Sequence, residues 1–308
     1  MNLDVIGIGA CTVDQLFITD QLPCFTKIGR ISKYARQLGG PVANALVSLA
    51  RLGVRTKFIG KVGNDDEGVF IAQELRKENV DTSDLDFEIG SESRLVLVII
   101  DRLTGERSFT YRPDNLLPFT LTDLHKQSIA SSKVLLVDEA SELSFQAVSY
   151  ANDIGVHTVY DGGWFSDSAI ELLPLVDTPI LSSDFVQQWL PRASLETAIE
   201  ELFKLNRKFV IITCGNKGCI TMQREGKFKY SAFPIKALDT TGAGDAFHAG
   251  FIYGFLKGWI PDETIKFASA VAAINCLSIG GQAGLPTMQA VKVFLDENDL
   301  HFRRDVIN

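Results

Sequence analysis

A glycine-rich turn followed by an acid lies near the carboxyl end of the chain, in the stretch Asp-Thr-Thr-Gly-Ala-Gly-Asp-Ala-Phe at residues 239–247. Apolar residues at spacings of three and four follow it, and this pattern predicts a helix that begins at the turn. The first N–H groups of a helix lack intrahelical partners and carry the positive end of the helix dipole. Because Gly242, Ala243 and Gly244 have almost no side chain, a phosphate can approach these N–H groups closely.

Asp245 follows in the first helical turn, beside this predicted anion site. A carboxylate placed there can accept the proton of a hydroxyl group that attacks a phosphate. The stretch therefore predicts transfer of a phosphoryl group from a nucleoside triphosphate to an alcohol. The alternative is an ordinary capped helix behind a glycine-rich turn, which a bare Gly-x-Gly would favour but the full nine-residue string does not.

The nine-residue stretch closely resembles the carboxyl-terminal signature of the PfkB (ribokinase-like) family of carbohydrate kinases. A second stretch, Gly-Gly-Pro-Val-Ala-Asn at residues 39–44, resembles the amino-terminal motif of the same family. The resemblance extends from residue 5 to about residue 294, and it implies ATP-dependent phosphorylation of a sugar or sugar-like alcohol. It also implies Mg²⁺ bridging the phosphates, Asp245 as the catalytic base, and the N–H groups of residues 242–244 stabilising the transferred group.

Polar residues at two places near the amino terminus are candidates for binding the sugar. Residues 3–9 predict a buried strand, and Asp14 lies just past its carboxyl end, where open α/β sheets bind ligands. A turn aspartate exposed to solvent is the alternative. The resemblance implies that Asp14, Gly39, Gly40 and Asn44 hold the sugar.

Two further residues are candidate sugar contacts on weaker grounds. Asp138 follows a short apolar strand predicted at residues 133–137, so it should lie at the same sheet edge as Asp14. Arg112 ends a strand predicted at residues 107–112, where either a substrate contact or a solvated strand end is possible. Arg112 would favour a ketose or an anionic sugar.

The nucleotide is expected on a second turn, Thr-x-Gly-x-x-Gly at residues 213–218, which follows a strand of β-branched residues. A tight hairpin turn is the alternative interpretation of this pattern. The resemblance implies that the nucleotide site consists of Thr213, Gly215, Gly218, Thr241, Gly242, Gly244 and Asn275. It further implies a monovalent cation such as K⁺, bound through backbone oxygens near Asp239 and Thr241.

The chain departs from the family pattern in two places. Val42 replaces a residue that is commonly small, which leaves the geometry of the sugar loop and the choice of sugar open. The family's Asn-x-x-Glu is absent, because Ser182 and Phe185 occupy those positions. Mg²⁺ binding must therefore depend more on water and phosphate oxygens than on this segment.

Alternating apolar strands and helical stretches predict an α/β fold with a mainly parallel sheet covered on both faces. We expect one domain over residues 1–308, as a three-layer α/β/α sandwich. Extended segments within about 13–38 and 94–112 should form a separate small β-sheet, with a hairpin turn at residues 103–106. The resemblance implies that this sheet is a lid over the sugar and pairs with a second subunit in a homodimer. Residues 299–308 are expected to be a loose tail.

Composition narrows the classes of partner. The 308 residues are 46% hydrophobic, carry a net charge of −8 and have no dense run of Lys or Arg, which argues against nucleic acid and anionic membranes. Five scattered cysteines form no zinc pattern and predict free thiols in a reducing cytoplasm. Neither a signal peptide nor a membrane-spanning apolar run is expected.

Several alternatives to a kinase of a ketose or ribose remain open. The substrate could instead be a 2-keto-3-deoxy sugar acid or a nucleoside. A regulator that binds nucleotide or sugar without turnover is a second class, favoured by the missing Asn-x-x-Glu and opposed by the intact Asp245. A dinucleotide-dependent oxidoreductase built on Gly7-x-Gly9 is weaker, because Thr12 replaces the third glycine and no helix pattern follows.

Overall fold

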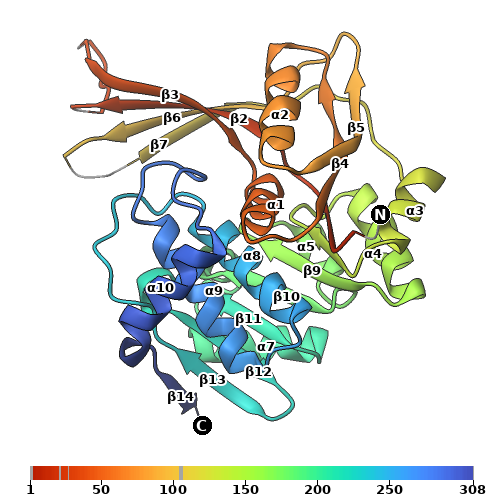
Figure 1. Cartoon of the computed structure of the whole chain (residues 1–308), viewed down its shortest axis with the longest axis vertical. Helices are drawn as coiled ribbons and strands as arrows, with labels where there is room; N and C mark the ends of the chain where they lie inside the picture. The colour runs from red at the N-terminus through yellow and green to blue at the C-terminus, as the bar shows by residue number, and fades with distance from the viewer. Residues whose placement is uncertain (1–2, 21, 27, 104–106, 308) are drawn as a thin grey trace.

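A large, mostly parallel sheet forms the centre of the molecule in the computed structural model, which describes residues 3–20, 22–26, 28–103 and 107–307 (Figure 1). Its strands, in spatial order, are β14 (Arg304–Ile307), β13 (Gly226–Tyr230), β12 (Cys219–Gln223), β11 (Val210–Thr213), β10 (Thr178–Ser182), β9 (His157–Gly162), β8 (Val134–Val137), β1 (Val5–Ile8), β4 (Thr56–Gly63) and β5 (Asp81–Glu88). In this order the strands from β11 to β5 run parallel, whereas those from β14 to β11 pair antiparallel.

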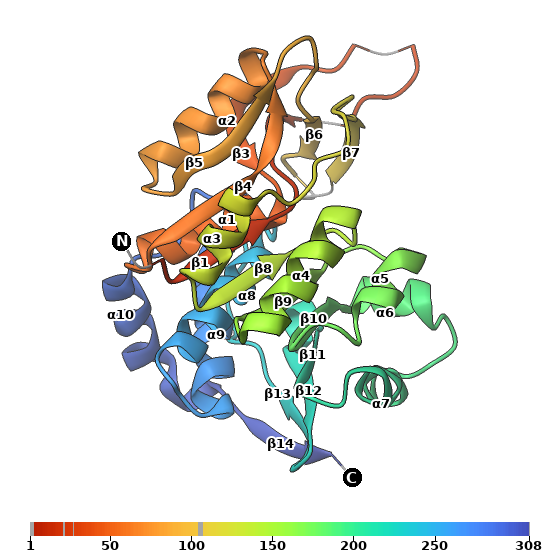
Figure 2. The same ribbon diagram turned by 90° about the vertical axis from the view of Figure 1, so that its right-hand side faces the viewer.

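Helices cover both faces of this sheet, and the strand sequences explain why (Figure 2). Along β8, Val134 and Leu136 belong to one hydrophobic core while Leu135 and Val137 belong to the other. A parallel strand buried on both faces reads as a continuous apolar run, which is the pattern seen here. The helices are α1 (Pro41–Arg51), α2 (Asp66–Lys77), α3 (Asp123–Ala130), α4 (Glu142–Ile154), α5 (Asp167–Leu172), α6 (Ser183–Trp189), α7 (Leu195–Asn206), α8 (Ala243–Leu256), α9 (Pro261–Asn275) and α10 (Met288–Asn298), with 3₁₀ turns η1 (Gly215–Lys217) and η2 (Asp299–His301).

The predicted three-layer α/β/α sandwich is therefore confirmed, and so is the smaller sheet beside it. That sheet has the order β3 (Ile31–Gly39), β2 (Thr12–Thr19), β6 (Leu95–Asp101) and β7 (Arg107–Arg112). It projects from the body next to α1 and α2 (Figure 1). Strands β6 and β7 pair antiparallel as predicted, while the expected turn between them lies largely outside the described residues, which omit 104–106.

Two segments differ from the sequence prediction. The loose tail expected at residues 299–308 is wrong, because η2 leads into β14, which pairs with β13 and extends the central sheet. Strand β5 was not predicted, since its sequence Asp-Thr-Ser-Asp-Leu-Asp-Phe-Glu is rich in acids. It forms at the edge of the central sheet, where only two of its residues, Thr82 and Leu85, are buried.

The predicted thiol state of the cysteines is confirmed, since all five are free in the structure. Within the described ranges, none of the helices has both the length and the apolar character needed to cross a bilayer.

Candidate active site

The turn before α8 has the geometry of an anion site, and its small residues serve different purposes. Gly242 is the N-cap of α8 and has a left-handed backbone with φ of 72°. A Cβ atom on Gly242 would lie 2.5 Å from the carbonyl oxygen of Gly281, so the close approach of residues 280–284 also requires a glycine. A Cβ atom on Gly244 would meet no atom within 4 Å, so this side of the turn is open to a ligand.

Some backbone N–H groups of this turn donate within the protein, and others have no intrahelical partner. Ala246 donates the first helical hydrogen bond, to the carbonyl of Gly242 at 2.9 Å. The helix pattern therefore leaves the N–H groups of Gly244 and Asp245 without an intrahelical partner. The N–H of Ala243, which was expected to bind phosphate, donates to the carbonyl of Thr240 at 3.2 Å.

Two side chains brace the turn from behind. The carboxylate of Asp239 accepts from the backbone N–H of Thr241 at 2.9 Å and from that of Gly280 at 2.8 Å, so it ties the turn to the loop at residues 280–284. Asn275 is fully buried and donates to the carbonyl of Thr241 at 3.0 Å. Asp239 thus supports the turn with its side chain, Asn275 contacts the turn itself, and a contact of Asn275 with the nucleotide stays a prediction.

Asp245, the predicted base, and Asn44, which is predicted to bind the sugar, are in direct contact. Asn44 Nδ2 donates to Oδ2 of Asp245 at 2.6 Å, although these residues are 201 positions apart in the chain. Asn44 Oδ1 in turn accepts from Nε2 of Gln282 at 2.8 Å. This chain of bonds joins the start of α1, the start of α8 and the loop at residues 280–284. Gln282 was missed as an individual residue, because only the glycine-rich loop around it carries a sequence signal.

Gly39 and Gly40 leave room for neighbouring groups, including the carboxylate of Asp14, which is predicted to bind the sugar. A Cβ atom on Gly39 would lie 2.2 Å from Oδ1 of Asp14, so only glycine leaves space for this side chain. Thr12 Oγ1 donates to the same oxygen at 2.7 Å, a contact that the sequence did not predict. Gly40 is the N-cap of α1 with φ of 99°, and a Cβ atom there would lie 2.3 Å from the carbonyl oxygen of Ala10.

Asp138 is half-buried, and its carboxylate joins two segments of the protein. It accepts from the backbone N–H of Ala10 at 2.9 Å and from that of Val42 at 3.1 Å. These bonds tie the segment after β1 to the first turn of α1, on which Asn44 also lies. Asp138 therefore assembles the sugar loop in this structure, and a direct sugar contact stays a prediction.

Asp245, Asp14 and Asp138 all have raised pKa values. Burial, followed by the charge of Asp161, raises the pKa of Asp245 to about 7, against the lowering effect of the Asn44 hydrogen bond. Burial also raises the pKa of Asp14 to about 6, and the Thr12 hydrogen bond opposes it. The pKa of Asp138 is raised well above its usual range, mainly by burial. An acid whose pKa lies near 7 can gain and lose a proton at physiological pH, as a general base must.

Two arginines beside these motifs already have anionic partners. Arg112 Nη2 donates to the carbonyl of Ser93 at 3.0 Å, and Nη1 lies 3.3 Å from Glu92 Oε1. Arg94 pairs with Asp114 at 3.0 Å and with Glu139 at 2.7 Å. The role predicted for Arg112 in binding substrate stays a prediction.

The predicted nucleotide turn joins β11 to β12, and these strands are antiparallel, so it is a hairpin connection. Thr213 ends β11, and its hydroxyl lies 3.4 Å from the carbonyl of Leu181. Gly215 and Gly218 both have positive φ values, and a Cβ atom on Gly218 would lie 1.9 Å from the carbonyl oxygen of Tyr230. Hairpin geometry thus explains the glycines, and nucleotide binding at this turn remains a proposal. At the positions of the missing Asn-x-x-Glu, Ser182 caps α6 and Phe185 is buried in the core.

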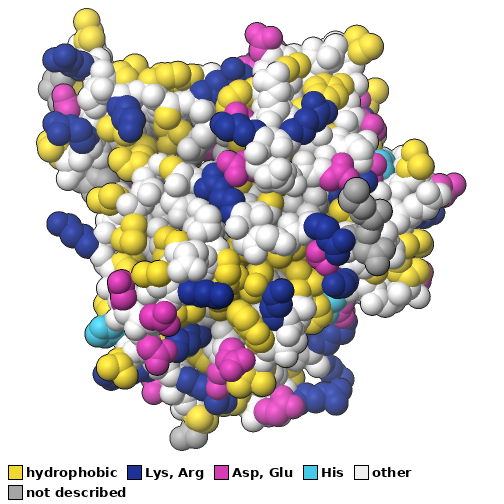
Figure 3. Space-filling model, in the orientation of Figure 1, with side chains coloured by type: hydrophobic (Ala, Val, Ile, Leu, Met, Phe, Trp, Pro, Cys, Tyr) yellow, Lys and Arg dark blue, Asp and Glu magenta, His cyan; other side chains and the backbone are white. Residues whose placement is uncertain are grey.

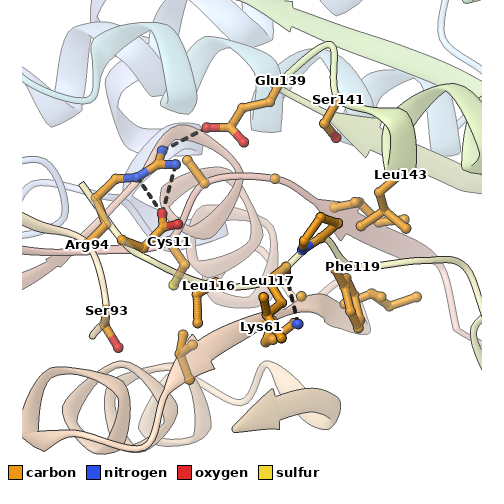
Figure 4. Close-up of a pocket in the computed structure, with 18 of the residues that line it drawn as sticks. Cys11, Lys61, Ser93, Arg94, Leu116, Leu117, Phe119, Glu139, Ser141 and Leu143 are labelled. Carbon is orange, nitrogen blue, oxygen red and sulfur yellow. Dashed lines mark hydrogen bonds and ion pairs between the residues drawn. The ribbon is translucent and has the colours of Figure 1, made fainter. Parts of the chain in front are cut away.

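A cavity of about 280 Å³ lies next to the segment after β1 that Asp138 holds (Figure 4). It is lined by the end of β1, by β4, by the segment at residues 114–119 and by the start of α4. Arg94 and Glu139 lie at one end and Lys61 and Phe119 at the other. Asp14, Asn44 and Asp245 are not among its lining residues, so the cavity borders the catalytic group rather than containing it.

Comparison with known proteins gives the family and fold to which this chain is similar. The family model for the pfkB family carbohydrate kinase matches residues 2–288. A 5-dehydro-2-deoxygluconokinase of Geobacillus thermodenitrificans is 29% identical over 85% of each chain. A ribokinase of Haemophilus influenzae is 29% identical over 96% of this chain and 99% of its own. The solved structure of an Arabidopsis thaliana ribokinase complexed with ribose and ATP superposes with a TM-score of 0.86 at 22% identity, over 96% of this chain and 99% of that one, which shows a shared fold.

Replacing Asp245 by Asn should stabilise the protein, by an amount that depends on pH. The folded-state pKa of Asp245, about 7, lies above the ordinary value of 3.8, so ionisation costs the folded state stability as pH rises from about 4 to about 7. The amide introduced by Asp245→Asn never ionises, and its side-chain oxygen can still accept from Asn44. We expect the free energy of unfolding of Asp245→Asn to exceed wild type by about 1–3 kcal/mol at pH 8, with little difference at pH 4.

Urea denaturation at both pH values measures this difference. The matched control is Asp153→Asn, which makes the same substitution at an exposed aspartate on α4. Equal free energies of unfolding for Asp245→Asn and wild type at pH 8 would show that ionisation of Asp245 does not destabilise the folded protein.

Proposed function

The chain belongs to the pfkB family of carbohydrate kinases, and on this basis we propose that it transfers the γ-phosphoryl group of ATP to a hydroxyl of a sugar held between the small sheet and α8. As a member of this family it is a phosphotransferase that acts on a sugar hydroxyl. The observation that carries the proposal is the 2.6 Å hydrogen bond between Asn44 and Asp245. It brings the predicted sugar motif and the predicted phosphate motif to one place.

In the proposed mechanism, Asp14, Gly39, Gly40 and Asn44 orient the sugar. Asp245 accepts the proton of the attacking hydroxyl, for which a pKa near 7 is suitable. The N–H groups at the start of α8 face the transferred phosphoryl group, where they stabilise the negative charge that develops during the transfer. The residues proposed to hold the nucleotide are Thr213, Gly215, Gly218, Thr241, Gly242 and Gly244.

Charge favours a neutral sugar over a sugar acid. The two arginines beside the site motifs, Arg112 and Arg94, are each paired with carboxylates of the protein. An anionic sugar would have to compete with these carboxylates, and it would lie near Asp14 and Asp245, which repel it. We therefore propose a ketose such as fructose, or ribose. The name of the Geobacillus relative points instead to a keto-deoxy sugar acid, so both classes belong in the test.

A panel of sugars tests the proposal through ADP release. We expect the purified protein to turn over a neutral sugar with a kcat/KM at least about tenfold above that for 5-dehydro-2-deoxygluconate or a nucleoside. Asp245→Asn should lower kcat by roughly a hundredfold or more while ATP binding is retained, because the base is lost but the phosphate-facing amides remain. Asp153→Asn again serves as the control.

The outcomes of this panel separate the alternatives. Preference for the sugar acid would keep the kinase and overturn the neutral-substrate proposal. ATP binding without turnover of any sugar would support the regulator. Near-normal turnover by Asp245→Asn would remove Asp245 from the role of base.

Mg²⁺ and K⁺ are proposed as cofactors of this reaction. The described residues include no cluster of three or more His, Cys, Asp or Glu side chains suited to a metal, so Mg²⁺ would be held mainly through the phosphates and water. When bound, it neutralises charge on the β- and γ-phosphates. The backbone near Asp239 and Thr241, tied to Gly280, is proposed for K⁺. The same assay without Mg²⁺, or with choline in place of K⁺, should show lower turnover.

The small sheet is proposed to be a lid that pairs with the lid of a second subunit. On the face that carries Asp14, strand β7 exposes Phe109 and Tyr111, whose exposed fractions are 59% and 67%. Figure 3 shows hydrophobic side chains among basic ones on this projecting part. Exposed aromatic residues on a sheet favour burial against another apolar surface.

Phe109→Glu should convert a dimer into a monomer, because it places a charge in the proposed lid contact. Sedimentation equilibrium measures the mass of each species. Leu300→Glu is the matched control, since Leu300 is 89% exposed but lies in η2, which leads into strand β14 of the central sheet rather than into the lid. A wild-type protein that sediments as a monomer would contradict the proposal.

A further inference from the structure

A buried acid and a buried histidine lie directly behind the first turn of α8. Asp161 is near the carboxyl end of β9, and His248 follows Asp245 by three positions on α8. The side chains of His248 and Asp161 are only 4% and 5% exposed, and Nδ1 of His248 lies 3.3 Å from Oδ2 of Asp161. Neither residue has a part in the mechanism above, although the charge of Asp161 acts on the pKa of Asp245.

Both nitrogens of the His248 ring face backbone carbonyl oxygens. Nδ1 lies 2.7 Å from the carbonyl oxygen of Gly244, and Nε2 lies 3.3 Å from that of Ile180. A carbonyl oxygen can only accept a hydrogen bond, so the ring bonds to both of them only when each nitrogen carries a proton. A ring that carries both protons is a cation, and a buried cation requires a nearby negative charge.

Asp161 provides that negative charge. Among the described residues, its Oδ2 atom is buried without a hydrogen-bond partner, and it lies 3.3 Å from Nδ1 of His248. Burial raises the pKa of Asp161, and the charge of His248 lowers it again. The two residues form one buried pair, held between β9 and α8.

We propose that Asp161 and His248 are a positioning pair for phosphoryl transfer. The ring of His248 holds the carbonyl of Gly244, and Asp161 holds the ring. Gly244 belongs to the first turn of α8, so the pair fixes the N–H groups that face the phosphate and the direction of the Asp245 carboxylate. This inference rests on the proposed role of Asp245 as the base.

The structure offers a matched pair without such a connection. At the opposite end of β9, Nδ1 of His157 lies 3.6 Å from Oδ2 of Asp177, and Asp177 also pairs with Lys208. His157 stacks on Phe255 near the far end of α8. A pair that only stabilises the fold should behave like this one when it is changed.

His248→Leu should lower kcat by about tenfold to a hundredfold, while the KM values for ATP and sugar change by less than about twofold. Small displacements of catalytic groups have effects of this size. His248→Asn should recover most of the loss, because an amide at this position can still donate to the carbonyl of Gly244, four residues earlier. His157→Asn should leave kcat unchanged. Equal kcat values for His248→Leu and wild type would overturn the proposal, and so would equal losses in His248→Leu and His157→Asn.

The pH profile gives a readout that a purely structural pair would not change. The charged groups that face Asp245 are Asp161 from β9, Asp14 from β2 and His248 from α8, with the amide of Asn44 from α1. Burial and the charge of Asp161 raise the pKa of Asp245, so removing that charge should lower it. Asp161→Asn should therefore move the acidic limb of kcat/KM to lower pH.

An unmoved acidic limb in Asp161→Asn would contradict the coupling of this pair to the base. Failure of the inference is distinct from failure of the proposed function. If the function fails, wild type shows no turnover, or Asp245→Asn keeps it. If only the inference fails, Asp245→Asn is inactive while the variants at residues 161 and 248 retain wild-type kcat and pH profile.

Discussion

The structure depends on bringing four carboxylates together near the carboxyl ends of β8 and β9 without losing the fold. Asp14, Asp138, Asp161 and Asp245 come from four distant parts of the chain, and burial raises the pKa of each. Buried like charges are destabilising unless each has a donor or a counter-charge nearby. Each acid here has its own partner: a hydroxyl, backbone N–H groups, an imidazole ring and an amide, respectively.

This arrangement explains why glycines precede so many functional residues. A side chain on Gly9 would lie 1.9 Å from Oδ1 of Asp138, and one on Gly39 would lie 2.2 Å from Oδ1 of Asp14. The glycines are needed because a carboxylate or a carbonyl occupies the place of the missing Cβ atom, in addition to the positive φ at Gly40 and Gly242. Backbone packing and site chemistry are therefore fixed by the same residues.

The regular parts of the fold could be predicted because their signals are local. The apolar strands β1, β8 and β11 and the glycine–proline start of α1 carry their periodicity or capping in the sequence itself. Strands β5 and β14 could not be predicted, because they form only by pairing with a neighbour at the edge of the central sheet. The site shows the same division. Asp245 lies within a local motif, whereas the roles of Asp161, His248 and Gln282 depend on residues up to 238 positions away.

The bond between Asn44 and Asp245 also shows contacts between the motifs that sequence reasoning did not foresee. The family resemblance assigned Asn44 to the sugar and Asn275 to the nucleotide. In the folded chain each amide contacts the other motif or its turn: Asn44 holds Asp245, and Asn275 holds the carbonyl of Thr241. An amide can donate and accept at once, so Asn44 donates to the carboxylate of Asp245 while it accepts from Gln282. The two motifs therefore need each other for their geometry, because the acid at the start of α8 is held by an amide from α1.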